Sequence, residues 1–279
     1  MILINNFFLA VIIFFSLMAR SGQVLAQEEP AIQDSKMVFE TQSFSQDIRQ
    51  LTLQYRGELE EYRKAEQEYN ILKQQYQQLG TLVSLEKAVR ATQEAMVVRA
   101  RVLQTYVRLL RFYLLSQAGI ELPQKQVAEQ NLLDTLSKIE QHQQELIEPL
   151  DKLQMRQVVF DFQELSMVIE ESVYRVFSLL AVGKLQTVHD KAIVLKEDMK
   201  DQLATAGGAL KLAERQRSFD ETDRVLNSLK SSFDKAEAVF VDSHRISYKG
   251  VYKSNNNQLS LIYSSLSKAL VFLGELLKI

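Results

Sequence analysis

Hydrophobic and polar positions follow the period of an α-helix along most of the chain. From Thr41 the apolar positions recur every seven residues, and a second series follows three residues behind the first. The two series comprise Phe44, Ile48, Leu51, Tyr55, Tyr62, Ala65, Tyr69, Leu72, Tyr76, Leu79 and Val83. A heptad pattern sustained over several repeats is typical of a coiled coil. We therefore predict a long helix from Thr41 up to Gly80.

The segment Leu79-Gly80-Thr81 predicts a stop and a restart. Gly suits the position just past a helix end, and Thr is a favoured residue at the start of the next helix. The helical spacing then resumes and runs to Gly119, so the segments on either side of Gly80 are about equal, roughly 54 Å each at 1.5 Å per residue. We predict an antiparallel coiled-coil hairpin over residues 41–118. One continuous helix is the alternative, because a helical Gly costs only about 1 kcal/mol.

Residues 119–279 predict a bundle of further helices. Pro123 suits the first turn of a helix that runs to about Glu148, before Pro149. The stretch from Val173 to Val182 is apolar almost all round, as expected of a helix enclosed by others.

Later breaks are predicted at Gly183 and at Gly207-Gly208. Ser218 and Glu221 have the spacing of a capping box, and they precede a seam of Leu226, Leu229, Phe233, Ala236 and Phe240. A loop, SYKGVYKSNNNQ, then leads to a final helix from Gln258 to about Leu277.

Composition agrees with an all-α protein. The 279 residues include 9 Gly and 3 Pro, too few for the frequent turns of an all-β fold. Hydrophobic residues make up 46% and charged residues 24%, the balance of a folded globular chain. The predicted fold is therefore a long antiparallel coiled-coil hairpin, packed with or extending from a multi-helix bundle.

The N-terminus predicts a cleaved secretory signal peptide. The apolar run from Phe7 to Met18 is shorter than a membrane span, and Val24 and Ala26 occupy the small-residue positions of a cleavage site. Residues 1–26 are then the signal and 27–40 a flexible lead-in, which makes the protein periplasmic or secreted. The first six residues lack Lys and Arg, so an uncleaved N-terminal membrane anchor is the alternative.

Charge is distributed unevenly between neighbouring segments. The net charge is −2, which gives no general reason to expect nucleic acid as a partner. The segment from Thr81 to Ala118 contains six basic and two acidic residues, whereas acidic residues outnumber basic ones in the segment that follows. Because opposite charges favour contact, we expect these two segments to pack together. Arg101, Arg108 and Arg111 follow one side of the basic helix and are either partners for its acidic neighbour or contacts for a small anion.

The sequence predicts no catalytic, cofactor or metal site. It has no cysteine and only three histidines, and it contains none of the common nucleotide-binding, hydrolase or zinc-protease motifs. His142, Glu145 and Glu148 share one helix side, but their run is polar, and we interpret it as a solvated surface.

Two groups of aromatic residues are candidates for recognition. Arg245, Tyr248, Lys249, Tyr252 and Lys253 lie in the predicted loop and form a candidate recognition surface. Tyr55, Tyr62, Tyr69 and Tyr76 share the heptad seam with Leu and Ile, so we interpret them as buried packing residues, whose hydroxyl groups reach the rim.

These patterns favour a non-enzymatic extracytoplasmic scaffold, adaptor or partner-binding protein. Its partner would be another protein or a second copy of itself. A bundle that senses a small anion is one alternative. A membrane-active protein that uses residues 173–182 or the last helix is another.

Overall fold

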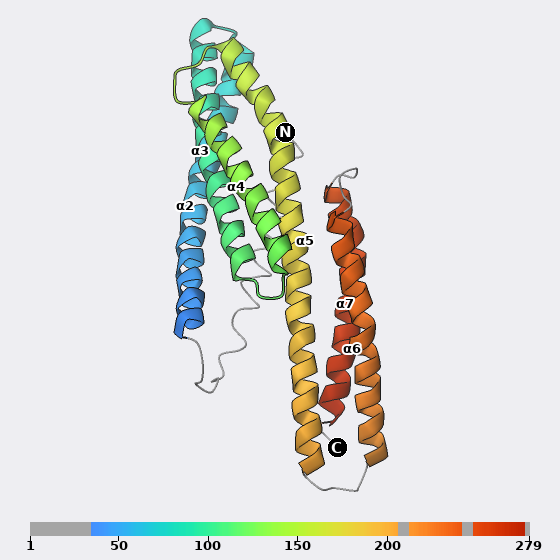
Figure 1. The fold of residues 1–279 in the computed structure, drawn as a ribbon. Helices are drawn as coiled ribbons and strands as arrows, with labels where there is room; N and C mark the ends of the chain where they lie inside the picture. Colours follow the sequence, from blue (N-terminus) through green and yellow to red (C-terminus); the bar gives the residue numbers. More distant parts are fainter. Residues whose placement is uncertain (1–34, 206–211, 242–247, 277–279) are drawn as a thin grey trace. The chain divides into compact units, whose positions relative to one another are not determined.

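A computed structural model describes residues 35–205, 212–241 and 248–276 (Figure 1). The chain divides into two units, Met1–Glu40 and Thr41–Ile279, and all contacts given below lie in the second. The described residues form six α-helices and no strand: α2 (Ser35–Leu79), α3 (Leu82–Ser116), α4 (Leu122–Gln144), α5 (Lys152–Thr205), α6 (Leu212–Val241) and α7 (Tyr248–Leu276). The all-α prediction is confirmed. The predicted signal peptide and the Gly207-Gly208 break lie outside the described residues.

Helices α2 and α3 form the predicted antiparallel hairpin. Gly80 has a φ of 60°, the left-handed conformation that a glycine adopts at little cost. Thr81 then caps α3, because its side chain accepts a hydrogen bond from the Ser84 backbone N–H and Ser84 accepts one from the Thr81 N–H. Further down the hairpin the Tyr55 and Tyr106 ring centroids are 5.7 Å apart. These two residues are equally far from the turn, as the antiparallel arrangement requires. Helix α2 begins at Ser35, before Thr41 and inside the predicted lead-in.

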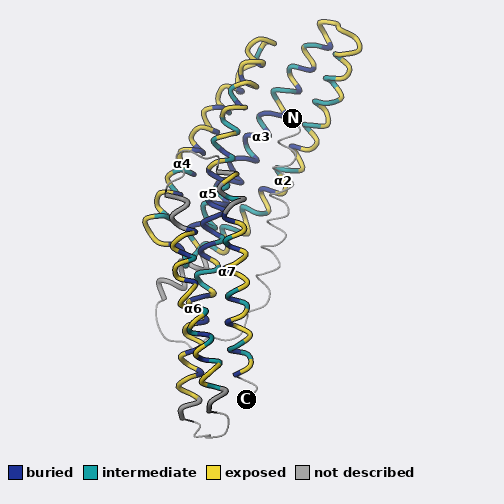
Figure 2. The backbone as a smooth tube through the Cα atoms, turned by 90° about the vertical axis from the view of Figure 1, so that its right-hand side faces the viewer, coloured by how far each residue is buried: buried dark blue, intermediate teal, exposed yellow. Residues whose placement is uncertain are grey.

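Helix α5 belongs to two groups of helices. Helices α3 and α4 pack against each other and against α5, and α6 and α7 likewise pack against each other and against α5. Figure 2 shows the buried residues on the sides by which the helices face one another. Thr135 of α4 is hydrogen-bonded to Ser172 over 2.8 Å. Tyr174, only two residues further along α5, already stacks on Tyr252 of α7 at 5.3 Å.

The overlap of the two groups explains the apolar stretch between Val173 and Val182. Both groups of helices cover α5 here, so positions on nearly every side of it are buried. This enclosure was predicted from the sequence.

Gly183 does not end a helix as predicted, because α5 continues through it to Thr205. Gly183 instead lies where the connection between α3 and α4 comes close to α5. A Cβ atom at Gly119 would lie 2.1 Å from the Gly183 carbonyl oxygen, and one at Gly183 would lie 2.5 Å from Ile120 Cγ1. The α3–α4 connection therefore passes α5 at a distance that leaves no room for side chains at these two positions.

The predicted start of α6 is also wrong. The helix begins at Leu212, so Ser218 lies inside it rather than at its cap. The Ser218 carbonyl accepts a hydrogen bond from Thr222 Oγ1 at 2.8 Å, and Glu221 pairs with Arg224. The predicted seam is otherwise observed over the described part, with Leu226, Leu229, Phe233 and Ala236 buried.

Helix α7 contains one stretch, Asn255–Leu276, whose length and composition would suit a membrane span. A third of that stretch is buried inside the bundle. Its buried positions include Ile262, Leu266 and Leu273, on the side that packs against the other helices. Part of the apolar character of α7 is therefore used in the core.

Candidate functional sites

A cation lies between α2, α3 and α5, at a position that the sequence did not single out. The guanidinium carbon of Arg99 is 3.5 Å from the centroid of the Phe162 ring. The same side chain is hydrogen-bonded to Tyr62 of α2. Burial lowers the pKa of Arg99, and the neighbouring Tyr62 and Glu66 oppose that shift. Burial also raises the pKa of Tyr62 to about 12. Arg99 therefore joins three helices through one desolvated charge.

His142 of α4 lies against the same aromatic ring. Its ring centroid is 5.3 Å from that of Phe162, and the side chain is buried. Its Nδ1 is 3.7 Å from the Glu145 carboxylate, whereas its Nε2 is buried without a hydrogen-bond partner among the described residues. Burial and the charge of Arg99 lower the pKa of His142, and Asp161 acts in the opposite direction. The prediction that this residue lies on a solvated surface is wrong, because the helix turns it toward α5.

A second polar cluster lies between α5 and α6. His189 is buried, its Nε2 is 3.2 Å from the Leu226 carbonyl oxygen, and its ring meets Phe233 edge-on at 5.6 Å. Two helical turns further along α5, Lys196 pairs with Asp223 of α6, and with its neighbour Glu197 at 2.8 Å. Burial lowers the pKa of Lys196, but these hydrogen bonds more than offset it and the pKa is raised. Every ionisable side chain of this cluster has a protein partner, which is typical of a structural role.

No three His, Asp or Glu side chains gather as a metal site within the described part of the chain.

Each of the three arginines singled out from the sequence is paired with a carboxylate. Arg108 reaches Glu140 at 3.1 Å and Arg111 reaches Glu129 at 2.6 Å, both on the acidic helix α4, as the charge pattern predicted. Arg101 instead reaches back to Glu61 of α2 at 3.0 Å. Anion binding at these arginines stays a prediction.

The predicted recognition loop is mostly helical, which corrects the sequence interpretation. Helix α7 begins at Tyr248, so Tyr248, Lys249, Tyr252 and Lys253 occupy its first turns, and Arg245 lies outside the described residues. Tyr252 is half-buried, and burial raises its pKa.

The reason for this extension of α7 is tertiary. Asn255 is buried, and its Nδ2 donates to the Ala236 carbonyl oxygen of α6 at 3.4 Å. Packing against α6 thus stabilises the helical conformation of this polar segment, whose local sequence is typical of a turn.

The tyrosine series is buried at one end and half-exposed at the other. Tyr55 and Tyr62 are buried, whereas Tyr69 and Tyr76 toward the turn are of intermediate exposure. Lys73 Nζ lies 5.4 Å from the Tyr69 ring centroid, and Lys152 Nζ lies 6.0 Å from that of Tyr76. The Tyr55 and Tyr62 rings are therefore packed in the core, whereas the Tyr69 and Tyr76 rings each lie near a lysine ammonium group.

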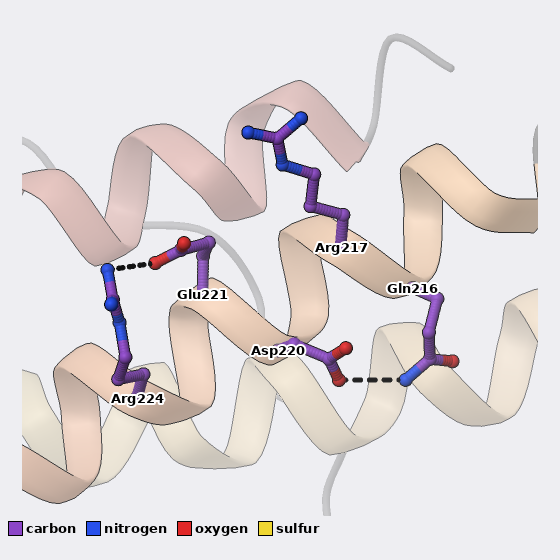
Figure 3. A pocket seen from close by; sticks show the side chains of 5 residues that line it. All are labelled: Gln216, Arg217, Asp220, Glu221 and Arg224. Atoms are coloured by element: carbon purple, nitrogen blue, oxygen red, sulfur yellow. Dashed lines mark hydrogen bonds and ion pairs between the residues drawn. The ribbon is translucent and has the colours of Figure 1, made fainter.

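A hollow on α6 is formed by residues of one helix only (Figure 3). Gln216, Arg217, Asp220, Glu221 and Arg224 line it. Gln216 donates to Asp220 at 2.9 Å and Arg224 pairs with Glu221 at 2.7 Å. These side chains satisfy one another along successive turns, as on an ordinary charged helix surface.

The turn of the α2–α3 hairpin exposes three large apolar side chains within five residues. Leu79, Leu82 and Val83, which we call the hairpin tip, are 65%, 69% and 60% exposed. Single exposed apolar residues are common on protein surfaces, but groups of them mark contact sites more often. The sequence signal was present, since Leu79 and Val83 belong to the heptad series.

No protein-family model, curated protein or solved structure matches this chain.

Proposed function

We propose that the chain is a non-enzymatic helical scaffold of the extracytoplasmic space that binds a protein partner through the hairpin tip. The observation that carries this proposal is the exposure of Leu79, Leu82 and Val83 together at the point where the chain reverses. Apolar side chains gain free energy, about 25 cal/mol per Å², when a partner covers them. A partner with an apolar groove or pocket has the matching chemistry.

Local geometry supports the tip as a binding element. Gly80 and the reciprocal Thr81–Ser84 hydrogen bonds fix the backbone between the two helices. A fixed backbone loses little conformational entropy when it binds, so more of the burial energy is available as affinity. Both helices of the hairpin run continuously away from the tip, which holds it at one end of a stiff element.

The alternative function, sensing of a small anion, requires the anion to displace an existing ion pair. An anion at Arg101, Arg108 or Arg111 has to compete with Glu61, Glu140 or Glu129, which already pair with those side chains. A flat thermal-shift response across organic acids and phosphates is the outcome that we expect.

Partner binding is tested by chemical crosslinking in cells that express the wild-type chain or one of two double variants. The tip variant is Leu82→Gln with Val83→Gln. The control is Leu261→Gln with Val271→Gln, two residues of α7 that are 70% and 59% exposed, similar to those of the tip. We expect a crosslinked partner band with wild type and control that is lost with the tip variant. Identical bands for all three proteins would contradict the proposal.

The compartment is tested separately. We expect N-terminal sequencing of the native protein from the extracytoplasmic fraction to begin at Gln27, the first residue after the predicted cleavage site. An intact Met1 in a membrane fraction would instead support the uncleaved anchor.

A further inference from the structure

Helix α5 carries an exposed apolar line along its N-terminal part. Leu153, Phe160 and Met167, which we call the α5 stripe, are 74%, 55% and 63% exposed. They are spaced by seven residues, so they lie above one another on one side of the helix. The line is about 21 Å long at 1.5 Å per residue. Met155, Val158 and Phe162 on the opposite side are buried in the core.

The stripe continues a line that already serves for helix packing inside the molecule. The next heptad position after Met167 is Tyr174, and Tyr252 of α7 stacks on it at 5.3 Å. At Tyr174 the line is covered by α7, whereas the three positions before it face solvent. The exposed stripe is thus an uncovered extension of an existing helix–helix seam.

The charges beside the stripe are arranged symmetrically about Phe160. Arg156 lies four residues before it and Glu164 four residues after it, on opposite flanks of the stripe. Both side chains are exposed, and neither forms an ion pair with any described residue. The apolar residues of the stripe are placed symmetrically as well, because Leu153 and Met167 are equally far from Phe160.

We propose that the α5 stripe binds the α5 stripe of a second copy of this chain, antiparallel, with Phe160 at the two-fold axis. In this arrangement Leu153 of each copy meets Met167 of the other, and Phe160 meets Phe160. Arg156 of each copy lies at the level of Glu164 of the other, which forms two ion pairs across the interface. An isologous contact of this kind is self-complementary and closes as a dimer.

The flanking charges select the antiparallel arrangement over the parallel one. A parallel pair in the same register would place Arg156 against Arg156 and Glu164 against Glu164, and like charges across an interface oppose association. The stripe covers only about four helical turns, so the contact belongs to the smaller class of specific interfaces. The dimer therefore forms and dissociates with concentration. This inference does not depend on the proposed function, since it uses neither the hairpin tip nor its partner.

Charge reversal with rescue tests the inference. Sedimentation velocity on the purified mature chain, at micromolar to millimolar concentrations, gives the dissociation constant of the dimer. Arg156→Glu and Glu164→Arg should each weaken the dimer by about tenfold or more, because each creates two like-charge contacts. The double variant restores the opposite charges and should return the dissociation constant close to that of the wild type. Lys87→Glu, which changes an exposed residue of α3 and the net charge by the same amount as Arg156→Glu, is the control and should have no effect.

A cysteine probe tests the same contact by position. The chain has no cysteine, so Phe160→Cys introduces one thiol that meets its own copy only at a two-fold axis. Under mild oxidation we expect a disulfide-linked dimer from Phe160→Cys. Met167→Cys alone should form no disulfide-linked dimer, whereas its mixture with Leu153→Cys should. A wild-type chain that remains monomeric at every concentration, or a double charge reversal that fails to rescue, would overturn the inference.

Discussion

The guanidinium carbon of Arg99 in α3 lies 3.5 Å from the centre of the Phe162 ring in α5. A cation over an aromatic face contributes from about 0.5 kcal/mol at an exposed site to about 2 kcal/mol when it is desolvated. We predict a coupling energy in that range from a double-mutant cycle with Arg99→Met and Phe162→Leu, measured by urea unfolding. Additive effects of the two substitutions would show that the contact contributes nothing beyond the separate packing of each side chain.

His142 makes stability depend on pH in the acidic range. Burial and Arg99 lower its pKa below the ordinary value of 6.5. The folded chain therefore binds fewer protons at this site than the unfolded chain, and stability falls as the pH drops from about 6.5 toward the folded-state pKa. Arg99 of α3, Glu145 at the end of α4 and Asp161 of α5 are the charged groups that face the ring.

We predict that His142→Leu flattens the dependence of the unfolding free energy between about pH 7 and pH 5. His142→Leu also removes the desolvated imidazole, so the comparison uses slopes against pH rather than absolute stabilities. An unchanged slope would assign the acid sensitivity to other groups.

Substitutions at glycine separate local from tertiary constraints. Gly119→Ala should destabilise by about 1–3 kcal/mol or more, because its Cβ would lie 2.1 Å from the Gly183 carbonyl oxygen and the backbone has to move. Gly57→Ala in α2 is the matched control, since no atom lies within 4 Å of its Cβ position. It should stabilise by about 0.5–1 kcal/mol through helix propensity. Opposite signs in thermal melting are the expected result, and two stabilising substitutions would contradict the close approach.

The tyrosine series should show a gradient of stability effects. Tyr62 is buried and hydrogen-bonded to Arg99, whereas Tyr76 is only partly covered. Tyr62→Ala should therefore cost about 3–5 kcal/mol, as for other large aromatic residues in cores. Tyr76→Ala should cost clearly less. Equal losses in denaturant unfolding would mean that the hairpin packs as tightly at its tip as near its middle.

The parts of the fold that depend on local chemistry were predictable from the sequence. Gly80 and Thr81 supplied both the left-handed residue and the cap, so neighbouring residues favoured a hairpin, with one continuous helix as the alternative. The enclosed stretch around Val176 was likewise visible, because burial on all sides leaves an apolar sequence on all sides.

Features that depend on distant contacts were not predictable. Gly183 resembles a break, and only the passage of Gly119 beside it explains why α5 continues. Asn255 resembles a turn residue, yet its amide is bonded to α6. Arg99 is one arginine among several in a basic helix, and nothing in the local sequence distinguishes the one that stacks on Phe162.

The most direct test of the account is photo-crosslinking in the native cell, with a photoreactive residue placed in turn at Leu82, Phe160 and the exposed control Lys87. The hairpin tip is proposed to bind another protein and the α5 stripe a second copy of the chain. We therefore expect a discrete adduct with another protein at Leu82, an adduct of twice the chain mass at Phe160, and neither at Lys87. Equal labelling at all three positions, or no discrete adduct at Leu82 and Phe160, would contradict the account.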